Sequence, residues 1–404
     1  MSSNQPPLSA KLDGLQSSAI RDLLKLTSRA EIISLAGGLP DAALMPRERI
    51  AEAAEHALGD AAVLQYTESP GWAPLRAVLV ERESRQLGRA VALDEVFVTH
   101  GSQQALSLLA EVLLDPGALV VVEDPAYVGA LQVFRAAGAR IVAVPLDAEG
   151  MRVDVLRTML AGGERPAVVH TVSNFHNPGG VTMSPRRRAE LAELADAHGF
   201  WVIEDDPYGE LWFDSPAPAP VATYSRNVIR LSSASKIIAP TLRVGWMIAP
   251  DGVCRAVELL KQGADLCGSA LTQQITAELL ADDSWFPAHL DTVRATYRTR
   301  AEALVRAVRT TFGDRLTCTD ASGGMFVWAS FTDGTDTAAL LPHALEQGVA
   351  YVPGAAFAVD TAYPHSMRMC FTTSDAQTLE QAVERLARAH AAGQRANSAH
   401  SIQS

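Results

Sequence analysis

Between residues 96 and 205, short runs of β-branched and other apolar residues alternate with longer amphipathic stretches. The runs "ALVVVED", "RIVAVPL", "PAVVHTV" and "FWVIEDD" predict strands, and the stretches between them, such as "YVGALQVFRAAG" and "PRRRAELAELADAHG", predict helices. Strands joined by helices of this length form right-handed crossover units, so they pair in parallel and are covered on both faces. The sequence therefore predicts an α/β fold with a mostly parallel sheet.

The pattern changes at about residue 285, which indicates a second unit. A long helical stretch is followed by the strand-like runs "GGMFVWASF", "GVAYVPG" and "SMRMCFTT" and by a final helix. We therefore expect a large domain over residues 46–284 and a smaller α+β domain over residues 285–404. Residues 1–45, which include the helix-like "SSAIRDLLKL", are expected to fold back onto the small domain or the cleft.

The net charge indicates which kinds of binding partner to expect, and the cysteine content indicates the cellular compartment. The formal net charge of -12 argues against a nucleic-acid or anionic-membrane surface, which requires clustered Lys and Arg, so small molecules are the expected partners. The 4 cysteines lack C-x-x-C spacing, which indicates neither a disulfide framework nor a metal site and fits the cytoplasm. We find no secretory signal and no apolar run long enough for a membrane helix.

Residues with polar or reactive side chains follow the expected strands at the points where the strands end. Because the active sites of parallel sheets lie at the carboxyl ends of the strands, we expect these residues to face one cleft. They are Gly101, Ser102, Tyr127, Asn177, Asp205, Tyr208 and Lys236.

Lys236, in "SSASKIIAP", is the residue around which the chemistry is organised. A lone lysine is more often a solvated surface charge, but a buried lysine near other positive charge has a lowered pKa and can form a Schiff base with an aldehyde. The aldehyde cofactor pyridoxal phosphate requires such a lysine, an acid at its pyridine nitrogen, a phosphate cradle and a stacking surface. Asp205 is the candidate acid, and Tyr208 and Asn177 are candidate partners of the phenolic oxygen, although each alone would more often be a turn or core residue.

The phosphate cradle is predicted from a second motif. "THGSQQAL" passes from a strand through glycine into a helix, and the free N–H groups and dipole of a helix start can hold an anion. Ser233, Ser235 and Arg243 would add hydroxyl and guanidinium donors. Tyr127 in "EDPAY" is the candidate for stacking on the ring.

Taken together, these motifs resemble the fold-type I pyridoxal phosphate aminotransferases of class I and II. They look most like the branch with 2-aminoadipate aminotransferases and kynurenine aminotransferase II. The shared strings span about residues 15 to 375. They include "IISLAGGLPD", "LQYTESPGWAPLR", "NFHNPGG", "VIEDDPYGEL", "SSASKIIAPTLRVGW", "GGMFVW" and "MRMCF".

The resemblance implies a seven-stranded, mostly parallel sheet in the large domain and a role for each motif residue. Lys236 would form the Schiff base with the cofactor, Asp205 would pair with the pyridine nitrogen, and Tyr208 and Asn177 would contact the phenolic oxygen. The phosphate would be held by Ser102, Gln103, Ser233, Ser235 and Arg243, with Tyr66 from the neighbouring subunit of a homodimer, and Tyr127 would stack. The substrate would be bound by Arg368 at its α-carboxylate, with Asn177, Gly38 and Arg21 alongside.

The implied activity is transfer of the amino group of an L-amino acid to a 2-oxo acid, usually 2-oxoglutarate, through Lys236. One departure leaves another outcome open: Gly179 in "NPGG" stands where the family usually has threonine, which removes a side chain close to the cofactor. A lyase, an oxidative deaminase or a decarboxylase of specialised metabolism is therefore the alternative. A transcription regulator with a fused DNA-binding module is disfavoured by the short stretch before the first motif and by the acidic charge.

Overall fold

The computed structural model describes residue 29 and residues 31–401, with side chains up to residue 395, and it contains two main sheets. The larger sheet has 8 strands in the order β2-β9-β8-β7-β6-β3-β4-β5. Neighbouring strands from β8 to β4 pair in parallel, whereas β9 and the two-residue β5 run antiparallel to their neighbours. The strands are β2 (Val96–Thr99), β3 (Leu119–Asp124), β4 (Arg140–Asp147), β5 (Gly150–Met151), β6 (Val168–Thr171), β7 (Trp201–Asp205), β8 (Val228–Ser233) and β9 (Gly245–Ile248).

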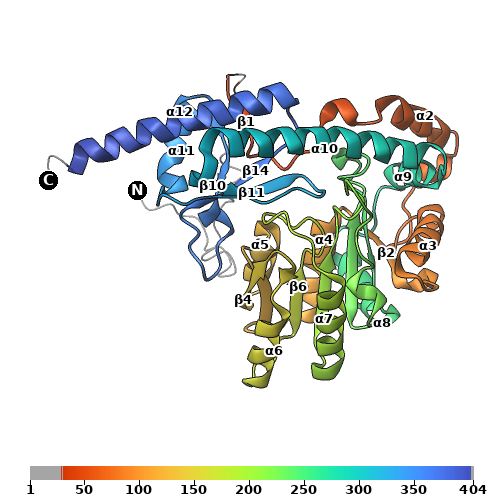
Figure 1. Ribbon diagram of the computed structural model, residues 1–404. Helices are drawn as coiled ribbons and strands as arrows, with labels where there is room; N and C mark the ends of the chain where they lie inside the picture. Colours follow the sequence, from red (N-terminus) through yellow and green to blue (C-terminus); the bar gives the residue numbers. More distant parts are fainter. Residues whose placement is uncertain (1–28, 30, 402–404) are drawn as a thin grey trace, which may run out of the picture.

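Helices cover both faces of this sheet, as the alternating pattern predicts. Successive side chains on a strand point to opposite faces, so Val120 and Val122 belong to one apolar cluster and Val121 to another. The helices α4, α5 and α8 pack with the first cluster, and α6 and α7 pack with the second (Figure 1). Their bounds are α4 (Ser102–Leu113), α5 (Val128–Ala136), α6 (Val153–Ala161), α7 (Pro185–His198) and α8 (Asp251–Ala264).

The smaller sheet is antiparallel, in the order β10-β11-β14-β13, and α10 and α12 pack side by side along it (Figure 1). A separate two-stranded parallel pair joins β1, near the start of the chain, to β12. The elements are β1 (Ile33–Ser34), β10 (Leu316–Cys318), β11 (Phe326–Phe331), β12 (Val349–Ala350), β13 (Val352–Pro353), β14 (Ser366–Cys370), α10 (Trp285–Phe312), α11 (Thr337–Glu346) and α12 (Ala376–Ser401).

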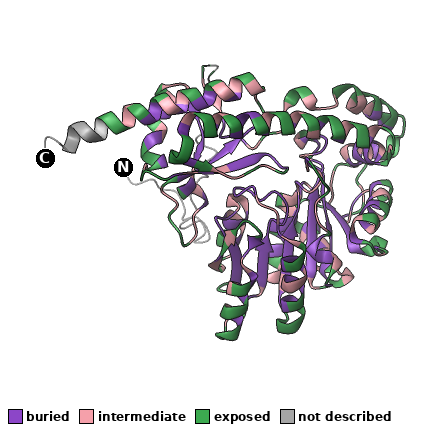
Figure 2. Ribbon diagram, viewed as in Figure 1, coloured by how far each residue is buried: buried purple, intermediate pink, exposed green. Residues whose placement is uncertain are grey.

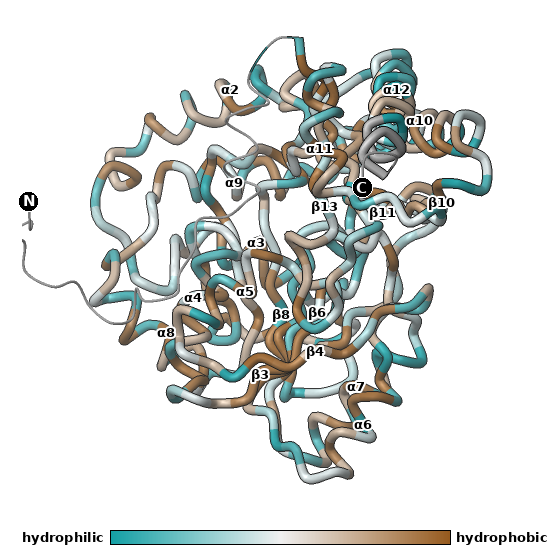
Figure 3. Tube along the Cα trace, turned by 90° about the vertical axis from the view of Figure 1, so that its left-hand side faces the viewer, coloured by the Kyte–Doolittle hydropathy of each residue, from teal (hydrophilic) through white to brown (hydrophobic). Residues whose placement is uncertain are grey.

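Three further helices lie near the β2 end of the large sheet: α3 (Ala73–Leu87) packs against β2, α9 (Ala270–Ala281) packs against α3, and α2 (Arg47–Leu58) packs against α9. Figure 2 shows the central strands as buried, while the outer faces of the surrounding helices are exposed. Figure 3 shows the same strands as the most apolar part of the chain. Among the described residues, none of the helices is both long and apolar enough to cross a bilayer.

Candidate active site

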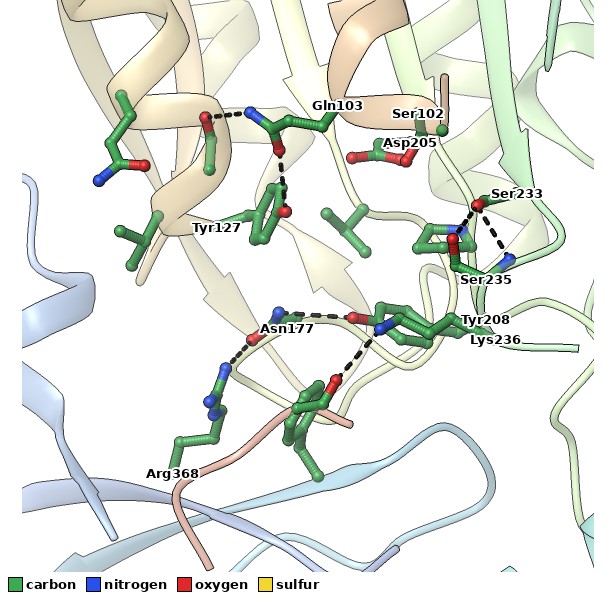
Figure 4. Close-up of a pocket in the computed structure, with 18 of the residues that line it drawn as sticks. Ser102, Gln103, Tyr127, Asn177, Asp205, Tyr208, Ser233, Ser235, Lys236 and Arg368 are labelled. Carbon is green, nitrogen blue, oxygen red and sulfur yellow. Dashed lines mark hydrogen bonds between the residues drawn. The ribbon is translucent and has the colours of Figure 1, made fainter. Parts of the chain in front are cut away.

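A cavity of about 450 Å³ lies at the carboxyl ends of the parallel strands, and Phe326 of β11 and Arg368 of β14 line its other side. Most residues that the sequence predicted for the site line this cavity (Figure 4). They are Gly38, Ser102, Gln103, Tyr127, Asn177, Asp205, Tyr208, Ser233, Ser235, Lys236, Arg243 and Arg368.

Lys236 lies in the turn directly after β8, and its ammonium group donates a hydrogen bond to the carbonyl oxygen of Gly38 over 3.1 Å. Burial lowers the pKa of Lys236 from 10.5 to about 8, and the positive charges of Arg368 and Arg243 act in the same direction. A fraction of the amine is therefore neutral near physiological pH. A neutral amine is the form that attacks an aldehyde.

Asp205, the last residue of β7, supplies a buried carboxylate at the wall of the cavity. The side chain is only 3% exposed, and its Oδ1 atom has no hydrogen-bond partner in the described part of the chain. A buried carboxylate oxygen without a donor is unfavourable, so the site is incomplete until a donor enters the cavity. The protonated ring nitrogen of pyridoxal phosphate is such a donor.

Asn177 joins two other residues at the cavity wall (Figure 4). Its amide donates to the hydroxyl of Tyr208 over 3.4 Å and accepts a hydrogen bond of 2.8 Å from Nη1 of Arg368. Arg368 also donates from Nη2 to the carbonyl oxygen of Ala36 over 2.7 Å, and its guanidinium lies 4.2 Å from the ring centroid of Phe326. Its Nε atom is buried without a partner among the described residues, so this N–H is available to a carboxylate.

The start of α4 and the loop before β9 form the predicted anion cradle. Gly101, with φ of 78°, precedes the helix, and no described side chain caps its first N–H groups. Arg243 lies beside this turn and donates to the carbonyl oxygen of His100 over 2.8 Å. Ser233 and Ser235 hydrogen-bond to each other over 2.9 Å. Free N–H groups, hydroxyls and a guanidinium are the donors that a phosphate requires.

Tyr127 stands at the start of α5, opposite Lys236 across the cavity (Figure 4). Its hydroxyl donates to Gln103 over 3.1 Å, and the Gln103 amide donates to the carbonyl oxygen of Gly129 over 3.1 Å. These contacts fix the phenol ring at the cavity wall. Burial raises the pKa of Tyr127 well above 10, so the hydroxyl stays protonated.

Comparison with known proteins identifies the family to which this site belongs. Residues 30–386 match the family of class I and II aminotransferases. The chain is 38% identical over 387 residues to aromatic-amino-acid aminotransferase 1 of Thermococcus litoralis, covering 94% of this chain and 93% of that protein. It is 39% identical over 384 residues to a 2-aminoadipate transaminase of Thermus thermophilus, covering 93% and 94% of the two chains.

A solved structure of an aminotransferase has the same fold as this chain. The α-aminoadipate aminotransferase of Thermus thermophilus, solved with N-(5'-phosphopyridoxyl)-L-leucine, superimposes with a TM-score of 0.88 at 35% identity, covering 96% of this chain and 98% of that one. The chain belongs to the class I and II aminotransferases. The fold-type I architecture and the pyridoxal phosphate cofactor predicted from the sequence are thereby confirmed. The expected seven strands are present, with the two-residue β5 added at one edge.

Tyr66 is the one predicted site residue, among those that the structure describes, that does not line the cavity of the aminotransferase. Tyr66 follows the short helix η3 (Ala61–Leu64) and is 79% exposed on the single chain. Arg21 and the helix-like segment around it lie outside the described residues.

The expectation for Gly179 needs correction. Gly179 is buried, but it is not part of the cavity wall, and a Cβ atom there would lie 3.1 Å from Nδ1 of His176 and 3.5 Å from Leu146. The side chain that this glycine lacks would therefore point into packed protein. The one sequence hint for a lyase does not change the cavity, and the comparisons favour transamination.

Sequence reasoning missed several residues that shape the site. Phe326 packs against both Arg368 and Tyr208, with a ring centroid distance of 6.1 Å to the latter. The string "GGMFVW" indicated this region without giving Phe326 a role. Val128, Gln132 and Val172 also line the cavity, and nothing in their local sequence distinguishes them from ordinary helix and strand residues.

Proposed function

We propose that this aminotransferase moves the amino group of an L-amino acid to 2-oxoglutarate, in two half-reactions at the cavity around Lys236. The observation that carries the proposal is the convergence of three groups on one cavity: a lysine with a pKa of about 8, the carboxylate of Asp205 and the buried guanidinium of Arg368. Oδ1 of the carboxylate and Nε of the guanidinium have no partner among the described residues. These groups supply respectively the proton-transferring amine, the partner for the ring nitrogen and the carboxylate-binding site.

The chemical roles follow from the contacts of each side chain. Pyridoxal phosphate, when bound, supplies a ring that takes up the electron pair released at the substrate Cα. The carboxylate of Asp205 keeps a proton on the ring nitrogen. The amine of Lys236 removes the Cα proton and returns it on the cofactor side, which its lowered pKa permits near neutral pH. Tyr208 and Asn177 donate to the phenolic oxygen.

Binding and orientation are proposed for the remaining cavity residues. Arg368 binds the substrate α-carboxylate, with Asn177 and the backbone at Gly38 alongside. Tyr127 stacks on the cofactor ring. The phosphate is held by Ser102, Gln103, Ser233, Ser235 and Arg243. This cradle is supported by the uncapped start of α4 and by the position of Arg243 beside it.

The substrate class is proposed from the relatives. Those described above are named for aromatic amino acids and for 2-aminoadipate. We propose that this chain takes donors of the same kinds, with Arg21 as the candidate partner of an acidic side chain.

Assembly and location are proposed on similar grounds. A cytoplasmic homodimer would place Tyr66 of one subunit at the phosphate of the other, which accounts for a tyrosine that is 79% exposed on the single chain. We also propose domains at residues 46–284 and 285–404, because the two main sheets fall on either side of this boundary, and we assign residues 1–45 to the cleft or small domain. The pairing of β1 with β12 supports the last assignment.

Steady-state assays with 2-oxoglutarate and a panel of aromatic, acidic and aliphatic L-amino acids test this function. We expect glutamate and the oxo acid of the donor to form in equal amounts. Formation of ammonia, of carbon dioxide or of an unsaturated product in place of glutamate would contradict transamination.

A further inference from the structure

Next to Asn177, a histidine outside the cavity lies between a hydrogen-bond donor on one side and a carboxylate, which can only accept, on the other. His176 is 1% exposed and precedes Asn177 directly. Its Nδ1 atom accepts a hydrogen bond of 3.0 Å from the backbone N–H of Gly179. Its Nε2 atom lies 3.0 Å from a carboxylate oxygen of Glu123, which is also buried.

These contacts determine which ring nitrogen carries the proton. A backbone N–H can only donate, so Nδ1 of His176 must be the unprotonated nitrogen. The proton therefore lies on Nε2, which faces Glu123 at 3.0 Å in a close polar contact that lacks the alignment of a hydrogen bond. The carboxylate of Glu123 is itself fixed at the end of β3, because it accepts from the hydroxyl of Thr171 over 2.6 Å and from the N–H of Val172 over 2.9 Å.

The imidazole thus links a tight turn to the central sheet. The N–H of Gly180 donates to the carbonyl oxygen of His176 over 2.6 Å, and the N–H of His176 donates to Val181 over 2.8 Å. The same turn carries Asn177, whose amide contacts both Tyr208 and Arg368. A shift of the turn would move the amide relative to both.

We propose that His176, anchored by Glu123, is a positioning residue for Asn177, and that Gly179 is the glycine this histidine requires. The inference rests on the proposed function in one respect, namely that Arg368 and Asn177 bind the substrate carboxylate. His176 does not line the cavity, so it acts only through Asn177.

Gly179 fits this role because of the space around it. A Cβ atom at position 179 would lie 3.1 Å from Nδ1 of His176, closer than ordinary van der Waals contact. The imidazole is packed on its other side against Glu123, so it has little freedom to retreat. A side chain at residue 179 would therefore displace either the ring or the turn.

The first test replaces the imidazole. His176→Leu removes both polar contacts, and we expect the KM for the donor amino acid to rise about tenfold, with a smaller change in kcat, which is the effect of weakening one hydrogen bond to a charged group. His176→Gln keeps an acceptor and a donor, so it should restore KM to within about threefold of the wild type. His198→Leu, at an exposed histidine at the end of α7, is the control.

The second test inserts a side chain at residue 179. Gly179→Thr should raise KM in the same way, whereas Gly252→Thr should not, because no atom of the described chain lies within 4 Å of a Cβ atom at Gly252. In Gly179→Thr combined with His176→Asn, the shorter side chain makes room, so the double variant should be less impaired than the sum of the two changes. If His176→Leu yields no soluble protein, the comparison of Gly179→Thr, Gly252→Thr and the double variant tests the positioning role instead.

The outcomes separate the inference from the function on which it rests. Wild-type turnover tests the function. If the wild type does not turn over, the dissociation constant of 3-phenylpropanoate for the cofactor-loaded protein replaces KM in every comparison. Unchanged KM and carboxylate affinity in His176→Leu or Gly179→Thr, with only a lower unfolding temperature, would overturn the positioning role. Additive effects in the double variant would overturn the pairing of residues 176 and 179.

Discussion

At the residue scale, the central quantity is the pKa of Lys236. The side chain loses most of its hydration, and its hydrogen-bond partner among the described residues is a neutral carbonyl, so the charged form is not stabilised as it would be by a carboxylate. In the cofactor-free protein, we expect the reactivity of Lys236 toward a small amine-directed reagent to rise through a midpoint near pH 8. Competitive labelling followed by mass spectrometry measures this midpoint, and an unfolded sample provides the reference near 10.5. A folded-state midpoint above 10 would refute the burial argument.

The same pKa shift has a consequence for stability. Folding lowers the pKa of Lys236, so between about pH 8 and 10.5 the unfolded chain binds more protons than the folded one. The free energy of unfolding of the cofactor-free protein should therefore rise with pH across this window, relative to Lys236→Met. Denaturant titrations of both proteins at several pH values measure the difference. If the difference in free energy of unfolding between the two proteins stays constant or falls from pH 8 to 10.5, the lowered pKa of Lys236 is contradicted.

Arg368 carries the second residue-scale prediction. Its guanidinium donates to Asn177 and Ala36 and lies over Phe326, and its Nε has no partner in the described part of the chain. The single ammonium of a lysine cannot reproduce this geometry. Arg368→Lys should raise the KM for the donor about ten- to a hundredfold, the effect of losing one or two charged hydrogen bonds. Saturation curves at fixed 2-oxoglutarate measure it. An unchanged KM would place the carboxylate elsewhere.

At the element scale, the anion cradle depends on the close approach of β9 to the start of α4. A Cβ atom on Gly245 would lie 2.5 Å from the backbone carbon of Gly101 and 2.6 Å from the N–H nitrogen of Ser102. Gly245→Ala should therefore push β9 away from the anion cradle, lowering the free energy of unfolding by about 1–3 kcal/mol and weakening cofactor binding. Gly252→Ala is the matched control. Equal cofactor affinities for the two variants would show that the cradle does not depend on this contact.

Much of the element arrangement could be predicted from the sequence, because a parallel sheet places the residues after each strand at one edge. That rule, with the motif strings, predicts that Ser102, Asn177, Asp205 and Lys236 face one cleft, and all four line the cavity. The setting of His176 could not be predicted, because Glu123 lies on another strand and their contact depends on side-chain packing. That a side chain at Gly179 would point toward His176 and not toward the cavity could not be predicted for the same reason.

At the scale of the whole molecule, the proposed homodimer makes each site depend on two chains. If Tyr66 acts across the interface, a mixed dimer of Lys236→Ala and Tyr66→Ala subunits contains one site with both residues intact. Mixing the variants under subunit exchange should therefore restore cofactor affinity and turnover at that site, although neither homodimer has both. Activity no greater than that of Tyr66→Ala alone would contradict shared sites.

The half-reaction tests the central claim most directly. The cofactor-loaded protein is mixed with a donor amino acid without any oxo acid and without air, and its visible absorbance is followed together with the oxo acid released. Transamination predicts loss of the yellow absorbance with one oxo acid formed per site, and recovery of the absorbance when 2-oxoglutarate is added. Continuous release of product without any bleaching, or bleaching that 2-oxoglutarate does not reverse, would show that the proton removed by Lys236 leads to a different reaction.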